Sequence, residues 1–480
     1  MKYYLFQEKM IKLISNQNKI FNGNIFEKSS VEECLEYFNN HKLIGVDTET
    51  EGFDPFTKQI LSLQFGDETT QFVIDKTVDL TIFKDLLEDS NKTFIFHNAK
   101  FDLKFLYKLN IIPNCVYDTY LGERLLYLGY PRGIVGMSLK DCCERYLNVH
   151  LDKSVRGSIF REGFTDRVIK YAADDVKYLI PLFKKQIMAL KEKDLLKAVK
   201  LECEFVPVLA YTEYSGIHLD KDKWLKKMQT DRDAYNKSLE TLNEWVIDNN
   251  LKQFINNELQ GDLFSGYPKP SCNINWSSPK QVIPFFESLG LNLEVVDKEK
   301  GGIKKSVEST VLESQKHKST VVPLYLDFKE KEKVVTTYGE TFIRQINPVT
   351  GRIHTQFTQL VDTSRMSSGG KDKDTGLEAI NLQNIPSDAD TRSCFTSVDG
   401  CVLIDCDFSS QEDLVFTELS KESKLIEFYN SPVKRDGHSF TAKMCFPDIL
   451  KDVPESEVKH LYSDLRAEAK KAKFAIKIVY

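Results

Sequence analysis

The alternation of apolar and polar positions predicts a layered α/β domain in the first part of the chain. Over residues 25–195, short β-rich runs such as Leu43–Val46, Ile60–Phe65 and Thr93–Phe96 alternate with helical stretches such as Ile169–Ile180. Strands that alternate with helices in this way bury their apolar faces in stacked layers. We therefore expect a β-sheet with helices packed against it.

The second part of the chain has a different pattern and is predicted to be mostly helical. Strand signals largely vanish after residue 195, and Trp224–Asn250 carries apolar residues at helical spacing. From Arg352 onward a mixed α/β region is expected. A chain of 480 residues suggests about three domains at roughly 150 residues each. We divide it into an N-terminal extension, the α/β domain, a helical region and a final mixed region, at residues 1–24, 25–195, 196–345 and 346–480.

Composition and charge are those of a soluble globular protein. The 65 Lys and Arg against 71 Asp and Glu give a net charge of −6, and 41% of residues are hydrophobic, which excludes global disorder. No apolar run approaches the roughly 18 to 20 residues of a membrane-spanning helix, and charges interrupt the N-terminus too early for a signal peptide. The ten cysteines include no C-x-x-C pair, which argues against a zinc module or a disulfide framework. We expect a cytoplasmic protein.

Three motifs carry candidate carboxylates, two where strands end and a third within a predicted helix. Asp47 and Glu49 follow an apolar strand and project from the same side of it, because side chains alternate with period two. Asp102 lies where a second strand runs into a helix. Tyr171 and Asp175 are four residues apart, about one helical turn. Taken singly, these sets also fit a solvated strand end, a helix cap, and a core-edge tyrosine beside a surface aspartate.

In their order along the chain, these residues resemble the three exonuclease motifs of the DEDD superfamily, in its tyrosine-bearing 3′→5′ branch. The resemblance implies a ribonuclease H-like mixed sheet with flanking helices. Four carboxylates suit two hard divalent cations, Mg²⁺ or Mn²⁺, one lowering the pKa of an attacking water and one stabilising the leaving 3′ oxygen. The tyrosine is expected to orient that water. The implied catalytic residues are Asp47, Glu49, Asp102, Tyr171 and Asp175, of which the four acids are the implied metal ligands.

A second group of motifs begins with Val402–Glu412, which predicts a strand that turns into a helix. Ser409 and Glu412 also fit a helix capping box, which is the alternative explanation. The segment resembles motif A of family A DNA polymerases, where a strand ends in a catalytic metal-binding aspartate and a glutamate on the following helix limits ribonucleotide entry. The resemblance implies these roles for Asp407 and Glu412.

A basic helix face follows near the end of the chain. Arg466, Lys470 and Phe474 recur at i, i+4 and i+8 and so share one face, although a solvated basic surface is the alternative. The arrangement resembles the fingers helix of the same family, where the cations bind the triphosphate of an incoming deoxynucleotide and the aromatic ring lies against its base. His438, after Arg-Asp-Gly, resembles the family's histidine near the triphosphate. The family expects a tyrosine one turn after the aromatic residue, where this chain has Ile478.

Segments upstream of motif A also resemble the family. Arg365 in T-S-R-M-S-S, and Gln383 and Asn384 in N-L-Q-N-I-P, are implied to lie near a DNA primer–template, where polar side chains can accept the degenerate minor-groove pattern. The regions then correspond to a 3′→5′ exonuclease domain at 25–195, a helical thumb at 196–345, and a partial palm with the start of the fingers at 346–480.

Polymerases of this family need a second metal-binding aspartate from a later His-Asp hairpin, which does not occur before Tyr480. We therefore expect the polymerase site to be incomplete in this chain and to be completed by a second polymerase fragment or a C-terminal part. Only about 40 residues precede the first exonuclease strand, too few for a typical further domain. That arrangement is similar to the compact polymerases of phages. If the protein is encoded by a phage, we expect it in the host cytoplasm.

Two other hypotheses remain beside the leading one. A self-sufficient nuclease of the ribonuclease D type would act on RNA, and the motif A and fingers-helix matches count against it. A non-catalytic DNA-binding assembly subunit would tolerate loss of carboxylates, and the intact exonuclease set counts against that. We expect a metal-dependent proofreading exonuclease within the N-terminal portion of a family A DNA polymerase, acting on primer–template and single-stranded 3′ ends.

Overall fold

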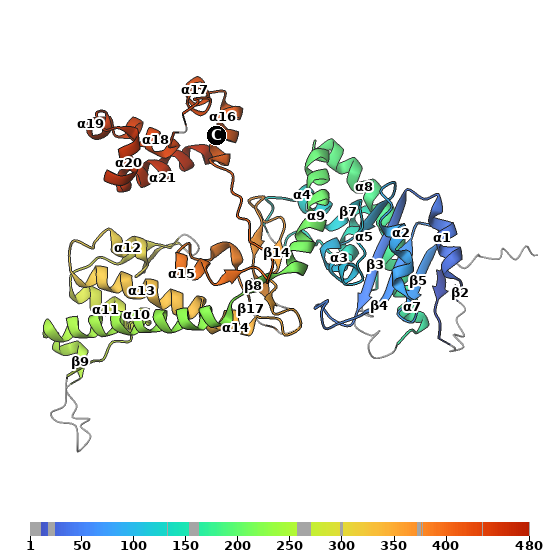
Figure 1. The fold of residues 1–480 in the computed structure, drawn as a ribbon, viewed down its shortest axis with the longest axis horizontal. Helices are drawn as coiled ribbons and strands as arrows, with labels where there is room; N and C mark the ends of the chain where they lie inside the picture. Colours follow the sequence, from blue (N-terminus) through green and yellow to red (C-terminus); the bar gives the residue numbers. More distant parts are fainter. Residues whose placement is uncertain are drawn as a thin grey trace, which may run out of the picture. The chain divides into compact units, whose positions relative to one another are not determined.

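The computed structural model describes residues 11–17, 25–131, 133–152, 163–256, 270–297, 301–371, 376, 378–433 and 435–479, with side chains through Lys473 (Figure 1). The chain divides into two compact units, Met1–Cys401 and Val402–Tyr480. Each unit is described by itself.

A seven-stranded mixed sheet forms the centre of the N-terminal region, with strand order β2-β1-β5-β4-β3-β6-β7. Strand β4 is antiparallel to both of its neighbours, and the other neighbouring pairs are parallel. The strands predicted from Leu43, Ile60 and Thr93 are all present. The strands are β1 (Ile11–Ile14), β2 (Phe26–Lys28), β3 (Leu43–Thr50), β4 (Ile60–Gly66), β5 (Gln71–Asp75), β6 (Thr93–Phe96) and β7 (Val116–Asp118).

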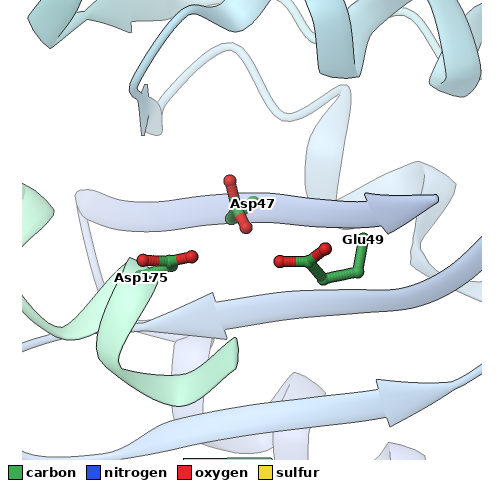
Figure 2. A group of neighbouring side chains, drawn as sticks. All are labelled: Asp47, Glu49 and Asp175. Atoms are coloured by element: carbon green, nitrogen blue, oxygen red, sulfur yellow. The ribbon is translucent and has the colours of Figure 1, made fainter. Parts of the chain in front are cut away.

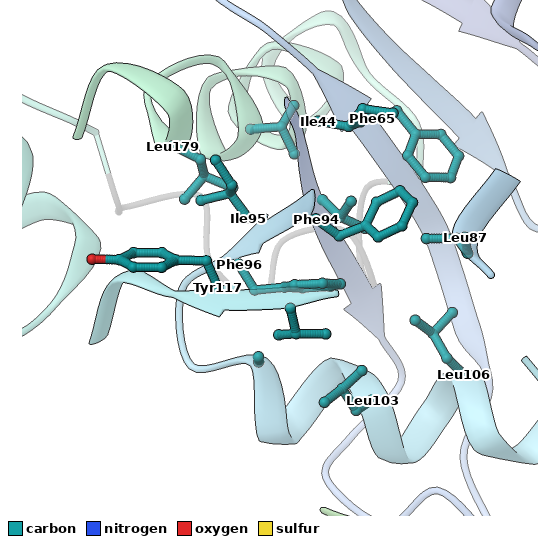
Figure 3. Packing of buried hydrophobic residues seen from close by; sticks show 14 of the residues in the cluster. Ile44, Phe65, Leu87, Phe94, Ile95, Phe96, Leu103, Leu106, Tyr117 and Leu179 are labelled. Carbon is teal, nitrogen blue, oxygen red and sulfur yellow. The ribbon is translucent and has the colours of Figure 1, made fainter. Parts of the chain in front are cut away.

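Helices cover both faces of this sheet, so its central strands are apolar on both sides. Along β6, Ile95 points toward Leu179, whereas Phe94 and Phe96 point to the side of Leu106 (Figure 3). The mixed α/β architecture is therefore confirmed. The helices of this region are α1 (Val31–Asn39), η1 (Leu80–Phe83), α2 (Lys84–Leu87), α3 (Ala99–Lys108), α4 (Thr119–Leu126), α5 (Leu139–Leu147), α7 (Asp166–Lys177) and α8 (Leu179–Glu192). The helix predicted over Ile169–Ile180 is thus two helices that meet at Tyr178.

The following region is mostly helical, as predicted. The long helix expected over Trp224–Asn250 is present, and it begins where the side chain of Asp220 accepts a hydrogen bond from Lys223 N. Its apolar side joins an aromatic cluster that includes Trp276 and Phe285. The helices are α9 (Leu196–Ser215), α10 (Lys221–Asp248), η2 (Lys252–Phe254), α11 (Pro279–Ser288), α12 (Ser309–Glu313), α13 (Val321–Thr337) and α14 (Glu340–Arg344).

Short strands and turns complete the first unit. A three-stranded sheet of order β13-β8-β18 brings together segments that are far apart in sequence. The remaining elements are β8 (Ile217–Leu219), β9 (Ile255–Asn256), β10 (Ser271–Cys272), β11 (Glu294–Val296), β12 (Ile303–Lys305), β13 (Arg352–Ile353), β14 (Phe357–Thr358), β15 (Ser367–Ser368), β16 (Gly370–Lys371), β17 (Glu378–Ala379), η3 (Leu382–Asn384), α15 (Ala389–Arg392) and β18 (Phe395–Thr396).

In the second unit, every regular element of the described residues is a helix. The mixed α/β region predicted for residues 346–480 therefore has strands only in its first part, before Val402. These helices are α16 (Gln411–Ser420), α17 (Ser423–Tyr429), α18 (Gly437–Cys445), α19 (Pro447–Leu450), α20 (Glu455–Leu461) and α21 (Ser463–Val479). None of the helices in the described ranges combines the length and the apolar character needed to cross a membrane.

The strand predicted to lead into Asp407 is wrong for this structure. Residues 402–408 carry no strand, and Val402, Ile404 and Phe408 are 79%, 82% and 77% exposed. A strand is stable only when its backbone groups pair with a neighbouring strand, and the described part of this unit contains none. The capping-box alternative is also wrong, because α16 begins after Ser410, whose side chain makes no capping hydrogen bond.

Candidate metal centre

Three carboxylates converge at the edge of β3. Asp47 and Glu49 project from this strand on one side, as their spacing predicts, and Asp175 reaches them from α7 (Figure 2). One oxygen from each lies within 4.8 Å of the others, and among the described residues they form the single group of this kind. Asp175 is buried, whereas Asp47 and Glu49 are half-buried. The arrangement offers oxygen ligands to a metal ion on a partly open face.

Two facing glycines explain how α7 comes close enough to deliver Asp175. Gly45 on β3 pairs directly with Gly66 on β4, on the sheet face that also carries Asp47. A Cβ atom at Gly45 would lie 2.7 Å from the carbonyl oxygen of Val176, and one at Gly66 would lie 2.6 Å from Val176 Cγ2. Because Val176 follows Asp175, the bare backbone at these two positions lets the helix seat its aspartate at the strand.

Tyr171 lies on α7 one turn before Asp175, as predicted. It is largely buried and packs in a small cluster with Leu61 and Val168. The helix begins where Thr165 accepts a hydrogen bond from Val168 N. Packing against β3, β4 and β5 therefore fixes the face that carries Tyr171 and Asp175.

Asp102 takes a different place from the other three acids. The pairing of β3 with β6 ends at Gly45, so Thr48 lies beyond the part of β3 that pairs with β6. Asp102 Oδ1 accepts this N–H at 3.0 Å and the Thr48 hydroxyl at 2.6 Å. Burial raises the pKa of Asp102 to about 7, although both bonds from Thr48 oppose the rise. Asp102 therefore binds Thr48, the residue between Asp47 and Glu49, and is not a member of the group of three carboxylates.

Asp118 is a supporting residue that the sequence did not single out. Its Oδ1 accepts the backbone N–H groups of Asn98 and Tyr120, both at 2.8 Å, and its Oδ2 accepts that of Ala99 at 2.9 Å. Burial raises its pKa to about 6 against these bonds. One carboxylate therefore holds the starts of both α3 and α4, and α3 carries Asp102. The signal was an aspartate that ends an apolar strand directly before a helix, as an N-cap does.

The motif A residues Asp407 and Glu412 do not belong to a carboxylate group like that of Asp47, Glu49 and Asp175 in the described part of the chain. Asp407 lies in the exposed segment before α16, and Glu412 is exposed in the first turn of that helix. No group of three metal-ligating side chains in the described residues includes either of them. Their predicted roles are therefore not supported by a formed site in this unit and stay predictions.

Asp436 links the basic face of α21 to His438, because it accepts hydrogen bonds from both Arg466 and the backbone N–H of His438. Arg466 Nε and Nη2 donate to the two carboxylate oxygens of Asp436 at 2.7 and 3.1 Å. Asp436 caps α18 and accepts the N–H of His438. Burial, with Lys473 and Arg466 nearby, lowers the pKa of His438. Lys470 lies exposed one turn beyond Arg466, and the side chain of Phe474 lies outside the described residues, as do those of 475–479.

The residues expected near a primer–template all lie exposed in the first unit. Arg365 follows a turn after β14, and the side chain of Gln383 accepts the N–H of Ser368 at 2.7 Å. The backbone carbonyl of Asn384 accepts the hydroxyl of Tyr338 at 2.6 Å. Exposure leaves these side chains able to meet a ligand, and their DNA contacts stay a prediction.

Comparison with known proteins identifies two family regions. Residues 23–189 match the family of 3′-5′ exonuclease domains, and residues 251–480 match DNA polymerase family A. DNA polymerase I of Borreliella burgdorferi is 27% identical over 97% of this chain and 48% of its own length. DNA polymerase I of Aquifex aeolicus is 25% identical over 90% of this chain and 68% of its own length. The chain thus spans about half the length of the first of these relatives.

A solved structure agrees with these matches in fold. The POL domain of Pol1 from M. smegmatis, in complex with DNA primer-template and dNTP, superimposes with a TM-score of 0.69 over 92% of this chain and 69% of that chain. At 21% identity, this similarity shows the fold alone. Together, the two family regions account for most of the chain and carry the carboxylate group and the basic helix in the expected order. The chain therefore belongs to the family A DNA polymerases and joins a 3′-5′ exonuclease domain to a family A polymerase region.

Proposed function

We propose that this chain removes nucleotides one at a time from the 3′ ends of DNA, as the proofreading exonuclease of a family A DNA polymerase. The convergence of Asp47, Glu49 and Asp175 in the region that matches the exonuclease family carries the proposal. The three carboxylates come from β3 and α7 and repel one another at this separation, and a bound cation would offset that repulsion. The geometry suits hydrolysis of a phosphodiester better than any chemistry that needs a nucleophilic side chain.

The donor set fits hard divalent cations. All three ligand groups are carboxylates, and oxygen donors are those that Mg²⁺ and Mn²⁺ prefer. Bound divalent ions, two in our proposal, would lower the pKa of a water and offset the charge that develops on the leaving 3′ oxygen. Asp47, Glu49 and Asp175 would hold them.

The remaining residues act on this group or on the water. Asp102 fixes the backbone of Thr48, between the two ligands of β3, and direct ligation by Asp102 stays a prediction. Tyr171, on the same helix face as Asp175, would orient the attacking water through its hydroxyl. A 3′ end enters from the half-open side because the opposite side is covered by α3 and the sheet core.

The polymerase region is proposed to bind primer–template and deoxynucleotides. Support comes from the polymerase family match and from the solved relative, which was determined with both ligands. The triphosphate would meet the basic face of α21, where Arg466 and Lys470 lie one turn apart, beside His438. The DNA contacts of Arg365, Gln383 and Asn384, the roles of Asp407 and Glu412, and completion by a second polymerase fragment stay predictions.

A primer assay tests the exonuclease. We would incubate a 5′-labelled primer, alone and on a template, with Mg²⁺, with and without all four deoxynucleotides. Stepwise shortening from the 3′ end is expected, and an Asp47→Ala, Glu49→Ala variant should leave the primer intact. A matched RNA strand that is shortened faster than the DNA would favour the ribonuclease D type instead. DNA that stays intact under all conditions would refute the proposal.

A further inference from the structure

A buried glutamate outside both family regions connects the exonuclease helix α3 to α9. Glu213 lies near the end of α9 and is 3% exposed. Its Oε1 is 2.5 Å from Lys100 Nζ and its Oε2 is 2.8 Å from Lys104 Nζ, both on α3. Position 213 follows the exonuclease match, which ends at 189, and precedes the polymerase match, which begins at 251.

The same carboxylate also binds a segment of the polymerase region. Glu213 Oε1 accepts the backbone N–H of Phe357 at 2.6 Å, and Lys100 Nζ donates to the carbonyl oxygen of Phe357. The carbonyl oxygen of Glu213 is 2.9 Å from His354 Nδ1. One side chain therefore joins α3 of the exonuclease domain to residues at β14, within the polymerase match.

Charge makes this junction depend on the ionised carboxylate. Burial is the largest influence on the pKa of Glu213 and opposes ionisation, but Lys104 and Lys100 together outweigh it and lower the pKa. Without the negative charge, two ammonium groups would face each other in a poorly solvated space. We expect them to separate and to pull α3 away from β14.

Helix α3 connects Glu213 to the candidate metal centre, because it contacts both. Lys100 and Lys104 are four residues apart and share one face, toward α9, whereas Asp102 lies between them and points to the opposite side. There Asp102 holds Thr48, between Asp47 and Glu49. A shift of α3 would therefore move the strand that presents two of the three carboxylates.

We propose that Glu213 is a positioning residue of the exonuclease, which fixes α3 through two lysines and makes the carboxylate geometry depend on the polymerase segment around Phe357. The inference rests on the proposed exonuclease function. It deepens that function, because proofreading needs the two domains to act on one primer, and this contact joins them within one compact unit.

Glu213→Gln in the full chain tests the inference on a single-stranded 5′-labelled oligonucleotide. We expect kcat to fall about 10-fold and the Mg²⁺ concentration for half-maximal rate to rise, with KM for DNA changed less than about twofold, because outer-shell groups tune metal sites by this order. Glu202→Gln is the matched control. Glu202 lies on the same helix and accepts a hydrogen bond from Gln359 of the polymerase segment at 2.6 Å, whereas the ion pairs to Lys100 and Lys104 of α3 are made by Glu213. Its kinetics should match those of wild type.

Folding is checked by thermal unfolding, with assays well below each midpoint. If Glu213→Gln does not fold, Lys100→Met carries the test, since it breaks the contacts to Glu213 and Phe357 but leaves Glu213 paired with Lys104. A folded variant that keeps wild-type kcat and Mg²⁺ dependence overturns the inference. Wild-type protein that does not shorten DNA would instead refute the proposed function, so the two failures are distinguishable.

Discussion

Asp102 and Thr48 meet through two hydrogen bonds to one carboxylate oxygen, Asp102 Oδ1, which takes both the N–H and the hydroxyl of Thr48. This contact holds the one residue that separates Asp47 from Glu49 on β3. Because α3 supplies Asp102 and Asp118 fixes the start of α3, the positions of Asp47 and Glu49 depend on a helix that contributes no oxygen to the group of three carboxylates.

Removing the hydroxyl of Thr48 should lower exonuclease activity. Thr48→Val keeps the shape of the side chain but deletes one of the two bonds to Asp102, and we expect kcat to fall about 10-fold, as for other residues that support metal ligands. Thr48→Ser should retain wild-type activity. Thr50→Val is the control on the same strand, because the Thr50 hydroxyl bonds to Gly52 O instead. Equal rates for Thr48→Val and wild type would contradict the role given to Asp102.

The two glycines under α7 should respond differently to the same substitution. An alanine at Gly66 meets a side-chain methyl of Val176, whereas an alanine at Gly45 meets its backbone carbonyl. Each single variant should lose about 1 to 3 kcal/mol of unfolding free energy by overpacking, together with activity. Adding Val176→Ala should rescue Gly66→Ala but not Gly45→Ala. A double-mutant cycle by urea unfolding measures this difference, and equal rescue of both would refute the close approach of α7.

Divalent metal should stabilise the chain as well as support hydrolysis. Chelation should abolish shortening, and Mg²⁺ should raise the unfolding midpoint, because an ion that binds only the folded state adds about 2.7 kcal/mol at 100 times its Kd. The Asp47→Ala, Glu49→Ala variant should show little Mg²⁺ stabilisation. Thermal unfolding against Mg²⁺ concentration measures both. The same increase in the variant would place the stabilising ion elsewhere.

The Asp436–Arg466 pair should make the stability of the second unit sensitive to acid. Burial disfavours the Asp436 carboxylate, but Arg466 and Ser439 outweigh it and hold its pKa well below the ordinary 3.8. A depressed carboxyl pKa stabilises the fold above the unfolded value and loses that effect as pH falls through the folded value. Wild type should therefore exceed Asp436→Asn in stability at pH 7. The difference should begin to shrink as pH falls below the ordinary value of 3.8 and should disappear only as pH falls through the depressed pKa of the folded state. Urea unfolding across this range checks it, with exposed Asp452→Asn as control.

A buried ion pair should stabilise the packing of α21 against α16. Lys473 Nζ lies 2.7 Å from Asp413 Oδ2, which also accepts the hydroxyl of Tyr429 at 2.7 Å. Lys473→Met should cost about 3 kcal/mol of unfolding free energy, because it leaves a buried carboxylate without its cation. Lys471→Met, at an exposed position of the same helix, should cost little. Replacing both partners by apolar residues should recover most of the loss, and a double variant as unstable as the single one would contradict this account.

Much of the candidate metal centre was predictable because the spacing rules of strands and helices are local. Period two puts Asp47 and Glu49 on one side of a strand, and a separation of four puts Tyr171 and Asp175 on one side of a helix, whatever those elements pack against. The same reasoning failed at 402–408. The apolar residues there predicted a strand. A strand also needs a neighbouring strand for its backbone hydrogen bonds, and the sequence of the segment does not show whether such a neighbour exists.

The sequence by itself determined the order of the motifs, the strand that carries Asp47 and Glu49, the helix that carries Tyr171 and Asp175, and the family to which the chain belongs. Only the tertiary structure decided which side chains meet. Lys100, Glu213 and Phe357 are separated by 113 and 144 positions, and no local pattern relates them. Asp102 could have been a cap or a ligand, and the end of the β3–β6 pairing placed it on Thr48. Contacts of this kind depend on packing between distant elements, because a side chain's partner is set by the fold that surrounds it.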